Sequence, residues 1–451
     1  MTLQERLADI VGAQHVLTDP AETKPYFTDW RRQYSAAAEC VVRPATTQQV
    51  SQVVALCARE NVAIVPQGGN TGLVGGSVPT GTRREVVLSL GRLNRIRALD
   101  PLNDTLTVEA GCVLAAVQSA AAEAGRLFPL SLAAEGSCQI GGNLSTNAGG
   151  VNVLRYGTAR EQVLGLEVVL PDGRVWDGLR GLRKDNTGYD LKQLFLGAEG
   201  TLGVITAAVL RLYPKPTASA TAWIALASAG EAVELLGALR AKLGDRISAF
   251  ELVSRTCLGA VLRHVPGLRD PFPAAHPWYV LAELGDSGPP AALRERVEEA
   301  LGEREAVLAQ SGEQARELWR IRESIPEAQF SNVKHDISVP VSQIPAFVQI
   351  CGQKLAARFP QAEIFCFGHV GDGNLHYNIG PPALLEQRAA VNDIVYEAVA
   401  GFAGSISAEH GLGQLKREEI RRHKPAVELE LMRTLKRALD PNGLMNPGKV
   451  L

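Results

Sequence analysis

Two histidines in the C-terminal part of the chain have a spacing that suits a shared metal ion. His369 and His376 each lie in a short β-type run, and glycine-rich residues separate the two runs. If Asp372 and Gly373 form a two-residue hairpin turn, as this pair favours, His369 lies directly opposite His376. Cross-strand neighbours have Cβ atoms about 4.5–5.5 Å apart, so two imidazoles could hold one ion. Asn378 would project from the same face, because side chains alternate along a strand.

An acidic residue further along the chain strengthens the metal interpretation. The segment 407–413 places Glu409 and His410 in a turn bounded by glycines. Two histidines and one glutamate form a three-ligand set that leaves room for substrate, as in catalytic zinc sites. We expect zinc, although manganese or ferrous iron would also suit nitrogen and oxygen ligands. The alternative is a pair of histidines hydrogen-bonded within a sheet, which would be favoured if the pair stood alone.

Three glycine-rich segments predict a binding site for a phosphorylated cofactor. The first, 66–77, directly follows a predicted strand, and its backbone N–H groups could bind a pyrophosphate. Asn70, Thr71 and Ser77 add polar donors to this loop. The segments 135–150 and 196–205 repeat the pattern, and their small residues would let a planar cofactor approach closely. A flexible surface loop is the alternative, and the absence of GxGxxG and GxxxxGK[ST] from the first loop disfavours a nicotinamide or ATP enzyme.

The composition predicts a globular protein of two domains. A chain of 451 residues exceeds one hydrophobic core, and 46% apolar with 21% charged residues is ordinary for a folded protein. The formal charge of −2 gives no reason to expect nucleic-acid binding, and no apolar run approaches a transmembrane length. The seven cysteines lack a CxxC pair and are expected to be reduced and buried. Because the first residues resemble neither a signal peptide nor a presequence, we expect a cytoplasmic protein.

The elements that must position these residues change in kind along the chain. Up to about residue 213, short β-rich runs alternate with helical patterns, and two prolines after Tyr213 mark a boundary. Beyond it, strands and helices without βαβ regularity predict an antiparallel sheet with helices on one side. The expected strands are 62–65, 86–90, 105–109, 164–170, 223–226 and 278–283, and the expected helices include 50–60 and 291–301.

The motifs resemble a known flavoprotein family. Residues 41 to 213 resemble the FAD-binding domain of the vanillyl-alcohol oxidase and p-cresol methylhydroxylase superfamily, and the whole chain resembles its D-2-hydroxyglutarate and D-lactate dehydrogenase branch. The string LRKDNTGYDLK at 182–192 is particularly similar to the 2-hydroxyglutarate enzymes. The resemblance implies an α+β fold, with a two-subdomain FAD-binding domain and a substrate domain whose antiparallel sheet is covered by helices. The implied divisions are a helical segment at 1–40, the FAD-binding domain at 41–215, a substrate and metal domain at 216–438, and a segment at 439–451 that returns to the flavin.

The resemblance implies FAD, with the first glycine loop on the pyrophosphate and the second around the isoalloxazine. None of the eight histidines lies between 42 and 263, so this domain cannot supply a histidyl link and we expect non-covalent FAD. The residues expected to bind it are Pro66, Gly68, Gly69, Asn70, Thr71, Gly72, Val74, Gly75, Gly76, Ser77, Leu130, Glu135, Gly136, Ser137, Gly141, Gly142, Asn143, Thr146, Asn147, Gly149, Gly150, Tyr156, Gly157, Gly200, Gly203, Val204, Ile205 and Asn446.

The same resemblance implies roles in the second domain. The implied metal ligands are His369, His376 and Glu409, the implied base and substrate contact is His410, and the further substrate contacts are Arg322, Lys334 and Asn378. An arginine offers a carboxylate a two-pronged hydrogen bond and a lysine offers a mobile charge, although by composition alone either would be a solvated surface charge. Pro326 departs from the animal enzymes, which have a hydroxyl-bearing residue at this position.

We therefore expect a FAD- and metal-dependent dehydrogenase that oxidises D-2-hydroxyglutarate to 2-oxoglutarate by hydride transfer to flavin. The metal would bind the substrate hydroxyl and lower its pKa, and His410 would remove the proton. A D-lactate or broad D-2-hydroxyacid dehydrogenase is the alternative, because lactate has no second carboxylate to pair with Lys334. A metal-dependent hydrolase, which needs no flavin, is the remote alternative. The residues leave open whether the electron acceptor is an electron-transfer flavoprotein or a quinone-type molecule, and whether the chain forms a homodimer.

Overall fold

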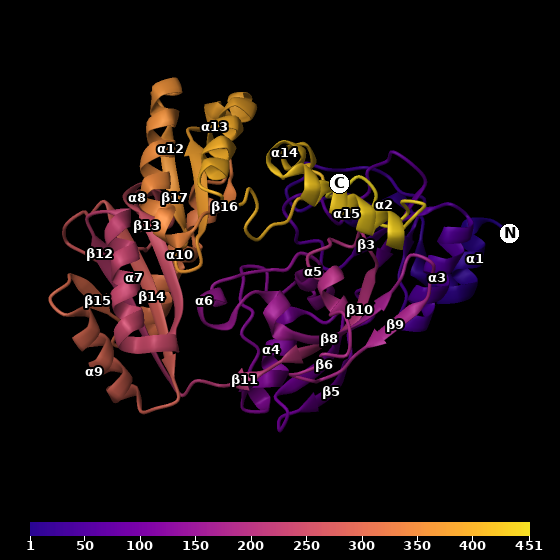
Figure 1. Cartoon of the computed structure of the whole chain (residues 1–451), viewed down its shortest axis with the longest axis horizontal. Coiled ribbons are helices and arrows are strands. Elements are labelled where there is room, and N and C mark those ends of the chain that lie inside the picture. The colour runs from indigo at the N-terminus through magenta and orange to yellow at the C-terminus, as the bar shows by residue number, and fades with distance from the viewer. The chain divides into compact units, whose positions relative to one another are not determined.

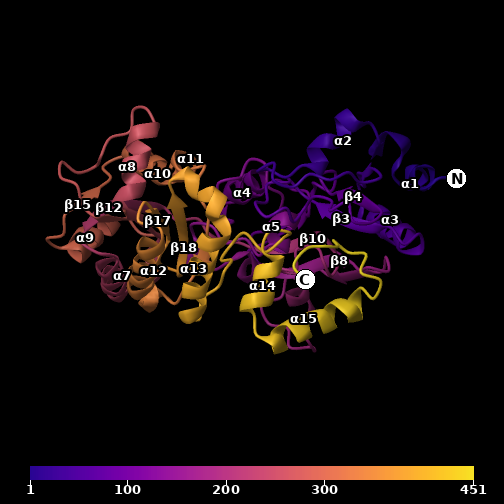
Figure 2. The same cartoon turned by 90° about the horizontal axis from the view of Figure 1, so that it is seen from above.

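The computed structural model describes residues 1–451, which form two compact units. Unit 1 consists of Met1–Ala148, Thr158–Pro214 and Glu409–Leu451, and unit 2 consists of Gly149–Gly157 and Lys215–Ala408. The last stretch of the chain therefore returns to the unit in which the first stretch lies. Figures 1 and 2 label the elements of each unit.

Unit 1 contains two main sheets and the helices that cover them (Figure 1). Its helices are α1 (Leu3–Val11), α2 (Pro20–Phe27), α3 (Thr47–Arg59), α4 (Leu114–Glu123), α5 (Ile140–Ser145), α14 (Arg417–His423) and α15 (Ala426–Leu439). Its strands are β1 (Val16–Leu17), β2 (Val41–Val42), β3 (Ala63–Gln67), β4 (Glu85–Ser89), β5 (Ile96–Asp100), β6 (Thr105–Glu109), β7 (Arg126–Leu127), β8 (Val163–Val169), β9 (Val175–Gly178), β10 (Val204–Arg211) and β11 (Tyr213–Pro214).

The first sheet has the order β1-β2-β4-β3, and β2, β4 and β3 run parallel. Helix α3 begins where the Thr46 side chain accepts the Gln49 N–H, which satisfies one unpaired amide of the first turn. Its residues Val50, Val53 and Cys57 are fully buried at helical spacing and pack in one core with the sheet. The predicted helix at 50–60 and the strands at 62–65 and 86–90 are confirmed. Strand β3 ends where the first glycine loop begins.

The second sheet of unit 1 is antiparallel, in the order β5-β6-β10-β8-β9. Helices α4 and α5 pack on it through Leu114, Val117 and Leu144. A Cβ on Gly141 would lie 2.7 Å from the Cβ of Ala110, so this glycine lets α5 approach the end of β6 closely. The second glycine segment is thereby fixed against the sheet.

Unit 2 is built on a seven-stranded antiparallel sheet in the order β15-β12-β14-β13-β17-β18-β16. The strands are β12 (Ala218–Leu226), β13 (Ile247–Ser254), β14 (Trp278–Asp286), β15 (Ala306–Leu308), β16 (Asp336–Ser338), β17 (Glu363–His369) and β18 (Asn374–Gly380). The helices are α6 (Val153–Tyr156), α7 (Ala229–Leu243), α8 (Arg255–His264), α9 (Pro290–Leu301), α10 (Gly312–Glu323), α11 (Ile325–Ala328), α12 (Ile344–Arg358) and α13 (Arg388–Gly401).

Helices cover both faces of this sheet, so the expectation of helices on one side is wrong. Figure 2 shows α7, α12 and α13 on one side of the strands and α8, α10 and α11 on the other. Strand β13 is buried at every position. Leu252 lies in the core between the sheet and α7, α12 and α13, and Val253 lies in the core between the sheet and α8, α10 and α11. A strand buried on both faces shows no alternation of apolar and polar residues. Without that alternation, the sequence does not indicate whether helices cover one face of the sheet or both.

The C-terminal tail completes the first sheet of unit 1. The Ile64 N–H donates to Leu444 O and the Asn446 N–H donates to Ile64 O, both at 2.8 Å, beside the bridge between Ile64 and Met445. Met445 is fully buried in the core under α3. The tail therefore covers the otherwise open edge of β3.

Candidate active site

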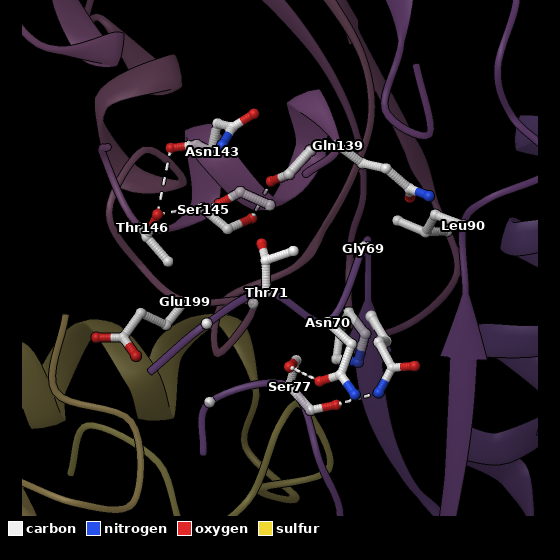
Figure 3. Close-up of a pocket in the computed structure, with 18 of the residues that line it drawn as sticks. Gly69, Asn70, Thr71, Ser77, Leu90, Gln139, Asn143, Ser145, Thr146 and Glu199 are labelled. Carbon is white, nitrogen blue, oxygen red and sulfur yellow. Dashed lines mark hydrogen bonds between the residues drawn. The ribbon is translucent and has the colours of Figure 1, made fainter. Parts of the chain in front are cut away.

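A pocket of unit 1 lies where β3 ends, and the three glycine-rich segments line it together (Figure 3). The lining residues are Pro66, Gln67, Gly68, Gly69, Asn70, Thr71, Gly72, Val74, Gly76, Ser77, Leu90, Cys138, Gln139, Gly141, Gly142, Asn143, Ser145, Thr146, Glu199, Gly200, Gly203, Val204, Ile205 and His410. Most of the predicted flavin contacts are therefore gathered around one cavity, and the predicted base His410 lines it too.

Some predicted flavin contacts lie outside this lining. They are Gly75, Leu130, Glu135, Gly136, Ser137, Asn147, Gly149, Gly150, Tyr156, Gly157 and Asn446. Of these, Gly149, Gly150, Tyr156 and Gly157 belong to unit 2. Ser137 lines an adjoining cavity that shares Gly68 and Gln139 with the first. The pocket lining also includes residues that were not predicted from the sequence, namely Gln67, Leu90, Cys138, Gln139, Ser145 and Glu199.

The loop after β3 is shaped by its own side chains. Asn70, at a φ of +53°, accepts a hydrogen bond from Ser77 Oγ at 2.8 Å and donates one to Thr28 O at 2.9 Å. Figure 3 shows the bond between Asn70 and Ser77 on one side of Thr71. These two polar side chains, expected as ligand donors, therefore hold the loop. A Cβ on Gly69 would lie 2.1 Å from Ser137 O, so the backbone requires glycine there.

The lining of the pocket fits a flavin dinucleotide. The side-chain oxygens of Gln139 and Asn143 are buried without a hydrogen-bond partner, which costs about 1–3 kcal/mol each unless a ligand donates to them. FAD carries such donors on its ribityl chain and its rings. Nothing lies within 4 Å of the Cβ positions of Gly72 and Gly142, so a phosphate has room to reach the backbone N–H groups.

The loop that carries His410 is attached to this pocket by Glu199. The Glu199 carboxylate accepts the N–H of Leu412 at 2.7 Å and the N–H of Gly413 at 2.8 Å. Burial raises the pKa of Glu199, and the two backbone donors together with the charge of Lys416 oppose that rise. The sequence indicates a special role for Glu199 in one way, because it is the one acidic residue in the otherwise apolar and glycine-rich segment 196–205.

In unit 2, β17 and β18 form the predicted hairpin, but its register differs from the prediction by two residues. His376 pairs with Phe367, and the predicted pairing of His376 with His369 is wrong. The Asp372 N–H donates to His369 O at 3.1 Å, which closes a turn longer than the two residues expected. Because a shift of two residues keeps every side chain on its face, the two imidazoles still lie on the same face of the sheet, as predicted. Ring nitrogens of His369 and His376 lie within 4.8 Å of one another.

Each of these histidines has a buried carboxylate beside it. Glu251 is the register partner of His369 and accepts a hydrogen bond from its Nδ1 at 2.5 Å. Asp336 is the register partner of His376, and an oxygen of the former lies within 4.8 Å of a nitrogen of the latter. Such a carboxylate orients a metal-binding histidine and selects its tautomer. Two converging imidazoles, one with the Glu251 carboxylate behind it and the other with the Asp336 carboxylate beside it, therefore fit a divalent metal.

Burial by itself would raise the pKa of Glu251. The charges of His369 and Arg322 and the hydrogen bonds from both side chains outweigh burial and lower the pKa to about 2. Glu251 is therefore ionised at neutral pH. Glu251 was not among the predicted site residues, although an acidic residue within the apolar strand 247–254 is an indication of function that the sequence contains.

Arg322 is not a solvated surface charge. It is buried at the end of α10, its Nε donates to Glu251 Oε2 at 2.8 Å, and its guanidinium lies over the ring of Phe367, 4.9 Å from the centroid. A buried arginine in this setting retains N–H donors that can form a fork for a carboxylate.

Lys334 and Asn378 are held by the protein backbone. Lys334 is half-buried, and its Nζ donates to Gln329 O at 2.8 Å. Asn378 is buried, and its Oδ1 accepts the His335 N–H at 2.9 Å. Both side chains belong to unit 2 with the histidine pair, whereas Glu409 and His410 belong to unit 1.

Two protein-family models match the chain. An FAD binding domain matches residues 38–178, and the C-terminal domain of FAD linked oxidases matches residues 215–450. A solved structure of p-cresol methylhydroxylase superposes with a TM-score of 0.78 at 19% identity, covering 99% of this chain and 96% of that chain. The protein is thus a FAD-dependent oxidoreductase with the p-cresol methylhydroxylase fold. The expected fold class and the expected FAD are confirmed, and the hydrolase alternative is set aside.

The chain belongs to the FAD-linked oxidase family, in its D-2-hydroxyacid dehydrogenase branch. The Bos taurus mitochondrial D-2-hydroxyglutarate dehydrogenase is 42% identical, with 97% of this chain and 81% of that protein covered. A D-2-hydroxyglutarate dehydrogenase of Xanthomonas citri is 40% identical over 98% of this chain and 96% of that protein. A Schizosaccharomyces pombe protein provisionally named as a D-lactate dehydrogenase is also 40% identical, with 96% and 85% covered.

The expectation of a cytoplasmic location is wrong by this comparison. The relatives from Bos taurus, Danio rerio, Oryza sativa and Arabidopsis thaliana are all named as mitochondrial proteins. The expectation relied on the character of the first residues and on reduced cysteines. All seven cysteines are free and buried, but buried thiols do not distinguish one reducing compartment from another. No helix has the length and apolarity needed to span a membrane.

Proposed function

We propose that this protein oxidises D-2-hydroxyglutarate to 2-oxoglutarate. The observation that carries the proposal is that Arg322 and His369 share one buried carboxylate, which keeps a carboxylate-binding group beside a metal-binding group. The names of the relatives support the same substrate. A dicarboxylate also needs a second cationic partner, and Lys334 of the same unit can supply it.

The roles of the residues follow from their chemistry. His369, His376 and Glu409 bind a divalent metal, for which zinc suits the ligand types. When bound, the metal would supply the charge that acidifies the substrate hydroxyl, and non-covalent FAD would supply the hydride acceptor. His410, which lines the flavin pocket, removes the hydroxyl proton, a task suited to a near-neutral imidazole. Arg322 and Lys334 hold the two carboxylates and Asn378 adds a polar contact. A separate acceptor, an electron-transfer flavoprotein or a quinone-type molecule, reoxidises the flavin.

A D-lactate or broad D-2-hydroxyacid dehydrogenase is the second candidate. Pro326 favours it, because a proline at the start of α11 offers no hydroxyl to the distal carboxylate of a larger substrate. The carbonyl of Pro326 lies 3.4 Å from Lys334 Nζ, so this substitution falls beside the lysine that separates the two candidates.

Anaerobic mixing of the flavoprotein with a panel of hydroxy acids tests the proposal. The panel holds both enantiomers of 2-hydroxyglutarate together with D-malate and D-lactate, and loss of flavin absorbance near about 450 nm reports reduction. We expect D-2-hydroxyglutarate to reduce the flavin fastest and its L enantiomer to leave it oxidised. Faster reduction by D-lactate would select the second candidate, and no reduction by any acid would exclude both. A His410→Ala variant should keep FAD and lose this reduction.

A further inference from the structure

One buried carboxylate joins two of the side chains to which the proposed function assigns ligands. The side chain of Glu251 has no exposed surface. Its Oε1 accepts a hydrogen bond from His369 Nδ1 at 2.5 Å, and its Oε2 accepts one from Arg322 Nε at 2.8 Å. A buried carboxylate is tolerated only when it is paired and hydrogen-bonded, and here each oxygen has its own donor.

The sheet of unit 2 dictates which side chains meet. Glu251 and His369 are register partners on β13 and β17, so their side chains lie next to each other on one face. Arg322 reaches that face from the last turn of α10, with Phe367 of β17 beneath its guanidinium. Two strands and one helix therefore converge on a single carboxylate.

We propose that Glu251 is a positioning residue that couples the metal-binding His369 to the carboxylate-binding Arg322. The proposal rests on the proposed function, because it takes over the roles given there to these two residues. By accepting the Nδ1 hydrogen bond, Glu251 holds the tautomer whose Nε2 carries the lone pair and makes that nitrogen more basic. By accepting the Nε hydrogen bond, it fixes the plane of a guanidinium whose other N–H groups form the carboxylate fork.

The consequence is that metal affinity and substrate affinity depend on one side chain that touches neither ligand. A matched control lies on the neighbouring strand. Glu283 of β14 pairs in register with Ala249, two residues from Glu251, so it faces the same side of the sheet. Its carboxylate accepts the Trp319 Nε1 hydrogen bond from α10, the helix that also carries Arg322. Changing Glu283 therefore removes a carboxyl group that contacts the same helix, without touching a proposed functional residue.

Titration of FAD-loaded, chelator-treated protein with Zn²⁺ tests the link to His369. We expect Glu251→Gln to lower the Zn²⁺ affinity about 10- to 100-fold and Glu283→Gln to leave it unchanged. Equal affinities of the wild-type protein and Glu251→Gln would overturn the inference. Failure of the wild-type protein to bind Zn²⁺ would instead overturn the metal site of the proposed function, so the two failures are distinguishable.

A double-mutant cycle tests the link to Arg322. Binding of 2-oxoglutarate, followed by the change in the flavin spectrum, is compared in Glu251→Gln, Arg322→Met and the double variant. We expect each single change to weaken binding and the second change to add little, because Glu251 acts through Arg322. Additive losses would overturn the coupling. If Glu251→Gln does not bind FAD, Glu251→Asp replaces it in the Zn²⁺ titration and in the 2-oxoglutarate cycle, with the same expected outcomes. Aspartate keeps the charge, but its shorter side chain loses the contacts with His369 and Arg322.

Discussion

Gly411 lies so close to Glu199 that a Cβ at position 411 would be 2.7 Å from Glu199 Oε1. The same carboxylate accepts the N–H groups of Leu412 and Gly413. One buried side chain of the flavin pocket therefore sets the path of the segment that presents His410, and the location of the proposed base is decided by contacts outside that segment.

Substitution Gly411→Ala should displace this segment. The added Cβ meets the carboxylate at a backbone φ of +77°, so both the contact and the conformation are unfavourable. We expect kcat to fall about 100-fold while FAD stays bound, because a displacement of about 1 Å can cost this much in rate. Gly188→Ala is the control, since its φ is +98° and nothing lies within 4 Å of its Cβ position. Full activity of Gly411→Ala would show that Glu199 does not position the base.

Metal removal should separate flavin binding from flavin reduction. After chelation we expect the flavin spectrum to persist and the rate of reduction by D-2-hydroxyglutarate to fall at least about 100-fold, since the hydroxyl is then no longer acidified. Zn²⁺ should restore the rate, and His376→Asn should behave like the chelated protein. A rate that chelation leaves unchanged speaks against the metal site and leaves the flavin assignment intact.

Lys334→Met should change substrate preference more than catalysis in general. Loss of a charged hydrogen bond to the distal carboxylate costs about 1.5–3 kcal/mol, which corresponds to a fall of about 10- to 150-fold in kcat/KM for D-2-hydroxyglutarate. D-Lactate, which has no distal carboxylate, is the internal control and should lose little. An equal loss for both acids would assign Lys334 to the α-carboxylate or to a structural role.

Lys449→Met should stabilise the protein in a pH-dependent way. Lys449 is 3% exposed, its Nζ has no hydrogen-bond partner, and burial lowers its pKa to about 8. The unfolded chain holds that proton up to about pH 10.4, so the stability of the wild-type protein rises between pH 8 and 10.4 as folded Lys449 becomes neutral. We expect the variant to gain up to about 3 kcal/mol in free energy of unfolding at pH 7, and this gain should shrink toward pH 10.

Lys436→Met is the matched control for this measurement. Its Nζ donates to Asp440 Oδ2, Thr201 O and Met445 O, so its loss should destabilise the protein. Denaturant unfolding of the two variants across pH 7 to 10 measures whether Lys449→Met raises the free energy of unfolding and Lys436→Met lowers it. A destabilised Lys449→Met protein would mean that a partner satisfies Lys449 in solution.

The local part of this architecture was predictable. Each glycine segment is contiguous in sequence, the first directly follows β3, and residues of all three line one pocket. The histidine hairpin was predicted with the wrong register, yet His369 and His376 still share a face, because the error was two residues and the strand repeat is also two. A shift of one residue would have placed the two rings on opposite faces.

The supporting carboxylates were not predictable by the same reasoning. Glu251 meets His369 across a separation of 118 residues, and only the pairing of β13 with β17 brings them together. Glu199 likewise meets the 409–413 segment through the fold alone. Residue types and short spacings identify groups that touch a ligand, whereas the groups behind them depend on strand order and register.

The return of the C-terminal tail to β3 has a consequence for biosynthesis. Residues 215–408 of unit 2 leave the ribosome before the tail that supplies Leu444 and Asn446 to Ile64. Until this tail has emerged, the nascent flavin-binding unit therefore has an uncovered β-edge, which is a template for pairing with other chains. All of residues 215–408 is thus synthesised while this edge of β3 is still unpaired, so the edge is open to wrong pairing for longer than any other part of the sheet's register.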